Sequence, residues 1–233
     1  MQFPQTLTHG FLIKRYKRFL ADVKLDDGTI VTAHCTNSGS MKSCIEEGAE
    51  VYLTPHDDPK RRTRFTWEMI KINGQWVGIN TSNPNTLVYE AIKNRSIQGL
   101  DMYTRVWREV RFEESRLDVF AENDIERCAI EVKNVTMKTG REALFPDAVT
   151  ERGLKHLHTL IRLKSEGIRA VMVYIIQRMD VDTFGPATEI DPAYAHGLAQ
   201  AVNAGIEIFA LQAKVSPTGI DIVRRLPYCH PNQ

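Results

Sequence analysis

The sequence predicts two domains of different architecture, a small closed β-barrel over residues 1–82 followed by an α/β domain over residues 83–233. In the first domain, short strand-like runs alternate with turn signals and little helix is predicted. From Asn83 onward, amphipathic helices alternate with apolar strands, which is the pattern of an α/β layout. The chain has 233 residues, of which 42% are hydrophobic and 25% charged, as is ordinary for a globular protein of two modest domains.

Five strands are predicted in the first domain. They are separated by turn-forming segments such as Asp26-Asp27-Gly28 and Asn73-Gly74. Five strands in about 80 residues favour a five-stranded barrel of the oligonucleotide-binding (OB) kind. The five runs are 11–21, 29–34, 49–54, 65–72 and 76–80.

The second domain is predicted to start with a helix that Asn83-Pro84-Asn85 opens. A second helix extends to about Glu166, and a third covers residues 192–204. The run 170–176 is continuously apolar, as expected of a strand that is covered on both faces. A last buried strand is predicted over residues 206–215.

A predicted hairpin in the second domain carries the strongest chemical signal. Its two strands, joined by the turn Glu122-Asn123-Asp124, bring Asp118 alongside Glu131, while Glu131 and Lys133 share one strand face. Two carboxylates and an ammonium group are what a magnesium-assisted attack on a phosphodiester requires. In that interpretation the acids hold the ion, and the lysine orients a water or steadies the developing charge. The alternative is an ordinary solvated, salt-bridged hairpin.

Charge alone does not identify a partner, because the formal net charge is only +1. Two local clusters combine cations with aromatic residues, which suits a surface that follows a nucleic-acid backbone and stacks bases. Solvated strands with snorkelling side chains are the alternative. The two clusters are Lys14-Arg15-Tyr16-Lys17-Arg18-Phe19 and Lys60-Arg61-Arg62-Thr63-Arg64-Phe65. Their candidate nucleic-acid contacts are Arg15, Lys17, Arg18, Arg61, Arg62 and Arg64.

The four cysteines form no Cys-x-x-Cys pair, which favours a reducing cytoplasm over a disulfide framework. No apolar run reaches 18 residues, so no membrane span is expected. His156 and His158 are two residues apart on a predicted helix and do not share a face. We therefore predict no metal role for that pair.

Taken together, the motifs resemble the sugar fermentation stimulation protein A (SfsA) family. The similarity extends in order from about Arg15 to Ala210. Its motifs are Arg15-Tyr16-Lys17-Arg18-Phe19, Ala33-His34-Cys35-x-Asn37-x-Gly39-Ser40-Met41, Asn80-Thr81-x-x-Pro84-Asn85, Ser115-Arg116-x-Asp118, Glu131-Val132-Lys133-Asn134-Val135-Thr136 and Phe145-Pro146-Asp147-Ala148-Val149-Thr150-Glu151-Arg152-Gly153-x-Lys155-His156.

The resemblance implies an OB-type barrel followed by a domain similar to the PD-(D/E)xK nucleases. It also implies DNA binding of low sequence specificity and a regulatory role in sugar (maltose) metabolism. The alternative function is a nuclease, dependent on Mg²⁺ or Mn²⁺, that acts on DNA or RNA. The sequence leaves open whether the chain is an enzyme and whether it forms homo-oligomers.

Carried onto this sequence, the nuclease pattern gives Asp118 and Glu131 as metal ligands and Lys133 as the catalytic lysine. Glu90 is similar in position to a helical acid that some nucleases use as a further ligand; the alternative is a surface carboxylate. Arg116 shares a strand face with Asp118 and is a candidate phosphate ligand, with a salt bridge to Glu131 as the alternative.

Overall fold

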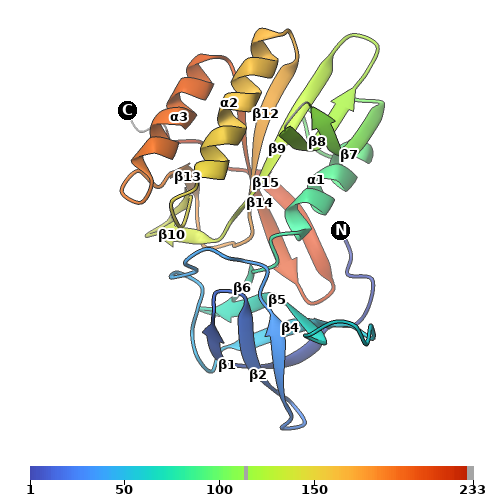
Figure 1. The fold of residues 1–233 in the computed structure, drawn as a ribbon, viewed down its shortest axis with the longest axis vertical. Coiled ribbons are helices and arrows are strands. Elements are labelled where there is room, and N and C mark those ends of the chain that lie inside the picture. Colours follow the sequence, from blue (N-terminus) through green and yellow to red (C-terminus); the bar gives the residue numbers. More distant parts are fainter. Residues whose placement is uncertain (113–114, 230–233) are drawn as a thin grey trace.

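The computed structural model, which describes residues 1–112 and 115–229, contains a closed β-barrel followed by an α/β domain, as the sequence predicts. Figure 1 shows the barrel at one end of the molecule and the larger α/β domain at the other. The connection between them is short, because the last strand of the first domain ends at Gly78 and the first helix begins at Asn83.

The barrel closes through a parallel pairing between its third and fifth strands. Ala33 pairs with Phe65 and His34 with Thr66, which joins the two ends of the strand order β3-β2-β1-β4-β5. A further strand, β6, extends the sheet along β5. The strands are β1 Thr8–Tyr16, β2 Leu20–Leu25, β3 Ile30–His34, β4 Glu50–Pro55, β5 Phe65–Ile72 and β6 Gln75–Gly78.

One predicted strand of the barrel is wrong. The run 11–21 is not continuous, because the chain turns at residues 17–19 and pairs with itself as the β1–β2 hairpin. Lys17 and Arg18 adopt positive φ angles of 49° and 66°, which reverse the chain without a glycine. Turn prediction depends on Gly, Pro, Asn and Asp, so a turn made by two cations carries no such signal.

The α/β domain is built on a six-stranded mixed sheet in the order β15-β14-β12-β9-β8-β7. Strands β9, β12 and β14 are parallel, and the outer strands are antiparallel to their neighbours. The strands are β7 Arg105–Phe112, β8 Ser115–Glu122, β9 Arg127–Val135, β12 Arg169–Ile176, β14 Glu207–Ser216 and β15 Gly219–Arg225. The helices are α1 Asn83–Lys93, α2 Glu151–Ser165 and α3 Pro192–Asn203. A small sheet contains β10 Met137–Thr139, β11 Glu142–Phe145 and β13 Thr183–Pro186.

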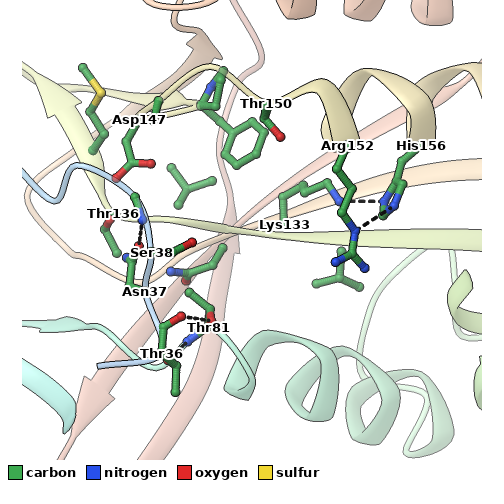
Figure 2. A pocket seen from close by; sticks show the side chains of 18 of the residues that line it. Thr36, Asn37, Ser38, Thr81, Lys133, Thr136, Asp147, Thr150, Arg152 and His156 are labelled. Carbon is green, nitrogen blue, oxygen red and sulfur yellow. Dashed lines mark hydrogen bonds between the residues drawn. The ribbon is translucent and has the colours of Figure 1, made fainter. Parts of the chain in front are cut away.

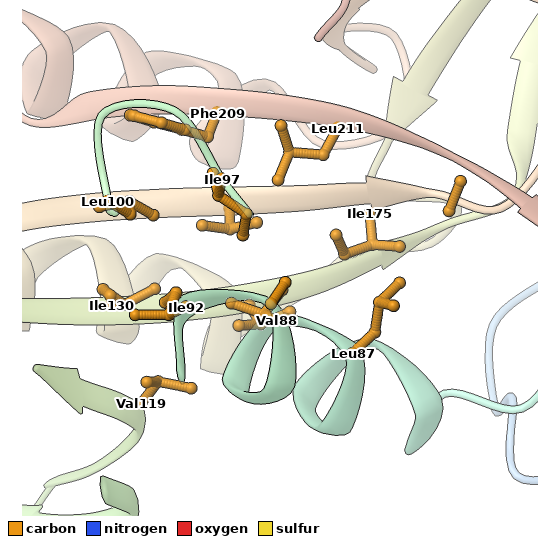
Figure 3. Packing of buried hydrophobic residues seen from close by; sticks show 14 of the residues in the cluster. Leu87, Val88, Ile92, Ile97, Leu100, Val119, Ile130, Ile175, Phe209 and Leu211 are labelled. Carbon is orange, nitrogen blue, oxygen red and sulfur yellow. The ribbon is translucent and has the colours of Figure 1, made fainter. Parts of the chain in front are cut away.

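Two apolar cores cover the two faces of this sheet. On one face, Leu87, Val88 and Ile92 of α1 pack with residues of the central strands, as Figure 3 shows. On the other face, α2 and α3 cover a second core that includes Met172 and Tyr174 of β12. Strand β12 is therefore buried from both sides, which confirms the interpretation of its apolar run.

The two domains are joined by a fully buried guanidinium group. Arg178 forms a bidentate ion pair with Asp180. Its Nε donates to Oδ1 over 2.7 Å and its Nη2 donates to Oδ2 over 2.9 Å. Its Nη1 donates to the Thr136 carbonyl at the end of β9 and to Ser43 in a barrel loop. Because a buried guanidinium must keep its partners, these bonds hold the barrel loop against the sheet.

Candidate active site

A pocket of about 400 Å³ lies where the barrel meets the α/β domain. Figure 2 shows Thr36, Asn37 and Ser38 of the barrel loop on one side and Arg152 and His156 of α2 on another. Residues 131–135 of β9 and Thr136 just after it line the pocket, as do residues 144–150 of the segment that leads into α2. The pocket wall is thus shared by both domains.

The two predicted acids lie together at this pocket. Val119 pairs with Ile130 across β8 and β9, and the next residues along these antiparallel strands are Asp118 and Glu131. Asp118 is oriented by two donors, since its Oδ1 accepts from Asn85 Nδ2 at 2.7 Å and its Oδ2 from the Val132 backbone N–H at 2.8 Å. Burial, followed by the charge of Glu131, raises the pKa of Asp118 to about 6.

Glu131 is almost fully buried, with 2% of its surface exposed. Lys133 Nζ donates to Glu131 Oε1 over 2.6 Å, and His156 Nδ1 contacts the same oxygen. Burial alone would raise the pKa of Glu131, but the charge of Lys133 and the contact with His156 outweigh it and lower that pKa. The pKa values of the two neighbouring carboxyl groups are therefore shifted in opposite directions, up for Asp118 and down for Glu131.

His156 joins the acid to a further cation. Arg152 Nε donates to His156 Nε2 over 3.3 Å, one helical turn away on α2. With Nε2 accepting this bond, the proton of a neutral ring is on Nδ1, which donates it to Glu131. The imidazole thus holds Glu131 beside Lys133, whose Nζ lies 3.0 Å from Nδ1.

The structure brings Asp118, Glu131 and Lys133 to one pocket but leaves Glu90 elsewhere. Glu90 is about half-exposed, and one of its carboxylate oxygens lies 3.8 Å from the N-terminal amine of Met1. On the same helix, Asn85 is the residue that reaches Asp118. Five helical residues correspond to about 500°, which places Glu90 well round the helix from Asn85. The structure therefore does not bring Glu90 to the acidic pair, and its role as a metal ligand stays a prediction that this geometry does not support.

The alternative interpretation, a salt bridge between Arg116 and Glu131, is wrong. Its Nε donates to Glu109 on the neighbouring strand, with 2.6 Å between Nε and the carboxylate oxygen. The predicted contact of Arg116 with a phosphate stays a prediction.

The cations of the first barrel cluster have different surroundings. Arg15 donates to the backbone carbonyls of Asn37 and Gly39, so its guanidinium group supports the loop and is not free to bind a ligand. Arg18 donates to the Ser38 carbonyl and lines the pocket, whereas Lys17 is exposed in the turn.

The second barrel cluster lies outside the pocket. Arg61, Arg62 and Arg64 are exposed in the loop before β5, and none of them lines it. Their predicted contacts with nucleic acid therefore stay predictions that the pocket does not support.

Several pocket residues were not singled out from the sequence. The two-residue spacing of His156 and His158 argues against a metal role for the pair, but it does not bear on His156 acting alone. Asp147 accepts a bond from the Met41 backbone N–H over 3.0 Å and thereby fixes the barrel loop. A Cβ on Gly39 would lie 2.2 Å from an oxygen of Asp147, so a larger residue there would require the carboxylate that holds Met41 to move. The quoted motifs contain these residues, but spacing alone gives them no role.

The donor set fits a hard cation with an incomplete protein shell. In the part of the chain that the structure describes, no group of three or more His, Cys, Asp and Glu side chains could hold an ion. The two adjacent carboxylates are nevertheless sufficient for Mg²⁺, which is commonly held by one or two carboxylates, with waters and substrate phosphates as its other ligands. Burial and the neighbouring charge of Glu131 raise the pKa of Asp118, and a bound cation would oppose both effects.

Fold and site together define a class of protein: an OB-type barrel joined to an α/β domain whose hairpin carries two acids and a lysine. Comparison with known families agrees. A family model described as the sugar fermentation stimulation protein RE domain matches residues 82–219, and one described as the SfsA N-terminal OB domain matches residues 13–79. The chain therefore belongs to the sugar fermentation stimulation protein family.

Relatives match along the whole chain. A sugar fermentation stimulation protein homolog of Geobacter sulfurreducens is 51% identical, and the match covers 97% of this chain and 98% of the relative. The homolog of Geobacter metallireducens is 48% identical, and the match covers 97% of this chain and 99% of that relative. Among solved structures, SfsA of Pyrococcus furiosus in complex with Ca²⁺ is 28% identical, with a TM-score of 0.88 over 98% of this chain and 97% of that one. Among the described residues, none of the helices is long and apolar enough to cross a bilayer.

Proposed function

We propose that this protein is a divalent-metal-dependent nuclease that binds DNA or RNA through the backbone, with little sequence readout. The observation that carries the proposal is the grouping of Asp118, Glu131 and Lys133 at one pocket lined by both domains. That a relative with the same overall fold was solved in complex with Ca²⁺ supports a cation as part of the site.

The residues have separable tasks in this proposal. Asp118 and Glu131 would hold Mg²⁺ or Mn²⁺, which supplies positive charge next to a phosphate and lowers the pKa of a nearby water. Asn85 and the Val132 N–H keep Asp118 aimed into the pocket. The Lys133 ammonium, which contacts Glu131, provides a donor for the charge that develops on the phosphate oxygens.

The direct test compares the wild-type protein with Asp118→Asn and Lys133→Met on labelled single-stranded and duplex DNA and RNA. Products that form with Mg²⁺ or Mn²⁺, disappear with EDTA and are absent in both variants would support the proposal. Glu90→Gln is the matched control, because Glu90 carries the same charge as the ligands but lies away from the pocket. Equal products from wild type and variants would identify a contaminant and refute the nuclease.

A second candidate is a DNA-binding protein that does not hydrolyse its ligand and regulates sugar metabolism. The ion pair between Lys133 and Glu131, 2.6 Å long, favours it, because the lysine satisfies the acid without any metal. Binding that falls steeply with salt, together with no product under any metal, would select this candidate. In either case the four free thiols suit the cytoplasm as its location.

A further inference from the structure

A second cavity, of about 460 Å³, lies beside the candidate active site on the outer side of α2. Apart from Thr159, its lining is basic, and none of the described residues that line it is acidic. The basic residues are Arg116, Arg152, Lys155, His156, His158 and Arg162. We call this cavity the α2 groove.

The groove follows from regular geometry. Arg152, Lys155, Thr159 and Arg162 recur on α2 at intervals of three and four residues, which places them on one helix face. Arg116 reaches the groove from β8, two residues before Asp118. Because side chains two apart on a strand share a face, Arg116 extends the basic surface from the groove toward the acidic pair.

The groove and the active-site pocket are adjacent and share two lining residues. Arg152 and His156 line both cavities, and Figure 2 shows these two side chains beside Lys133. A chain molecule whose reacting phosphate lies at Lys133 would therefore place its neighbouring units along α2.

The charges of the groove are accessible to a polyanion. Arg152, Lys155 and His158 are exposed, and no ion pair joins Lys155 to a carboxylate among the described residues. Arg152 donates to His156 within the groove, and Arg162 pairs with Glu166 over 3.1 Å. The ion pair of Arg116 with Glu109 is itself exposed, and a phosphate exchanges for such a carboxylate at small cost. These contacts distinguish α2 from the first barrel cluster, in which Arg15 is occupied by backbone carbonyls.

We propose that the α2 groove binds the backbone phosphates of the nucleic-acid strand next to the phosphate in the pocket. The groove is a non-catalytic subsite, and its ligand class is a polyanionic strand of DNA or RNA. It rests on the proposed function for the identity of the ligand but not for hydrolysis.

The test removes two groove charges that lie outside the catalytic group, in the double variant Lys155→Ala/Arg116→Ala. The probe is a fluorescein-labelled single-stranded oligodeoxynucleotide of about 20 nucleotides, enough for more than one binding segment. Its affinity is followed by anisotropy in EDTA from about 50 to 200 mM salt, a range over which lost phosphate contacts change the slope. The matched control is Lys24→Ala/Lys214→Ala, which removes two exposed lysines that line neither cavity.

Each phosphate contact to a single strand contributes about 0.7 to the slope of log K against log salt, so the groove variant should have a slope shallower by about 1.4. The control should keep the wild-type slope, and both variants should unfold at the wild-type temperature because all four side chains are exposed. A groove variant whose slope equals that of the control overturns the proposal.

The two proposals fail in distinguishable ways. If metal-dependent hydrolysis depends on Lys133 but the groove variant binds like the control, the groove proposal alone is wrong. If the groove variant has a shallower salt dependence than the control while no metal produces cleavage, the groove proposal is supported and the nuclease proposal is refuted. Wild-type protein that binds no oligonucleotide in low salt overturns both.

Discussion

Replacing Asp118 by asparagine tests whether the acidic pair is held together at a cost to the fold. Burial and the neighbouring charge of Glu131 raise the pKa of Asp118 from 3.8 to about 6. A carboxyl group with a raised folded-state pKa stabilises the fold below its unfolded pKa, and this contribution is lost as pH rises through the folded pKa. The wild-type protein should therefore lose free energy of unfolding at this site between about pH 4 and pH 6.

The structure sets the size of the effect. A pKa difference of about two units corresponds to about 3 kcal/mol. Asparagine stays neutral and avoids that loss, but its amide nitrogen cannot accept one of the two bonds that Asn85 and Val132 now donate. One lost bond costs about 1 kcal/mol. Asp118→Asn should thus be more stable than wild type by about 2 kcal/mol at pH 8 and less stable at pH 4.

Urea unfolding of both proteins in EDTA, at pH 4 and pH 8, measures this difference. A stability difference between them that does not change with pH would refute the reasoning, because the carboxylate would then carry no penalty. Ca²⁺ added at pH 8 provides a second readout. At about 100 times its dissociation constant it should stabilise wild type by about 2.7 kcal/mol and leave Asp118→Asn unchanged.

Three further substitutions test other contacts. Gly39→Ala would bring a Cβ to 2.2 Å from Asp147 and should lower the free energy of unfolding by about 1–3 kcal/mol in urea; unchanged stability would show that the loop adjusts freely. His156→Ala removes a donor to Glu131, so the pKa of Glu131 should rise and the acid limb of the hydrolysis profile should move to higher pH; an unmoved limb would contradict the positioning role. Glu90→Gln should retain wild-type metal affinity in calorimetry, and a large loss would return Glu90 to the site.

The fold could be predicted largely because its central features have local signals. The apolar run of β12 and the Gly- and Asn-containing turns of the barrel follow from periodicity and turn chemistry. The β1–β2 turn was missed because Lys17 and Arg18 adopt left-handed φ angles without turn-forming residues. The sequence does not predict strand β7, because none of its residues is buried and the apolar contrast on which strand prediction depends is weak.

The candidate site was predictable only where its members are close in sequence. Asp118, Glu131 and Lys133 share one hairpin, so strand alternation alone brings them together. His156 approaches from α2, 25 residues beyond Glu131, and its position depends on how that helix packs across the sheet. Asn85 likewise arrives from the opposite helix layer, where spacing along the chain gives no indication of Asp118.

The buried guanidinium of Arg178 bears on how freely the two domains can move at the pocket. Arg178 donates to Ser43 and Thr136, and Asp147 accepts from Met41. These bonds connect the barrel wall of the pocket to its α/β wall. These bonds oppose a closing movement of the two walls, so the proposed nucleic-acid strand would meet a pocket whose width is largely set in advance.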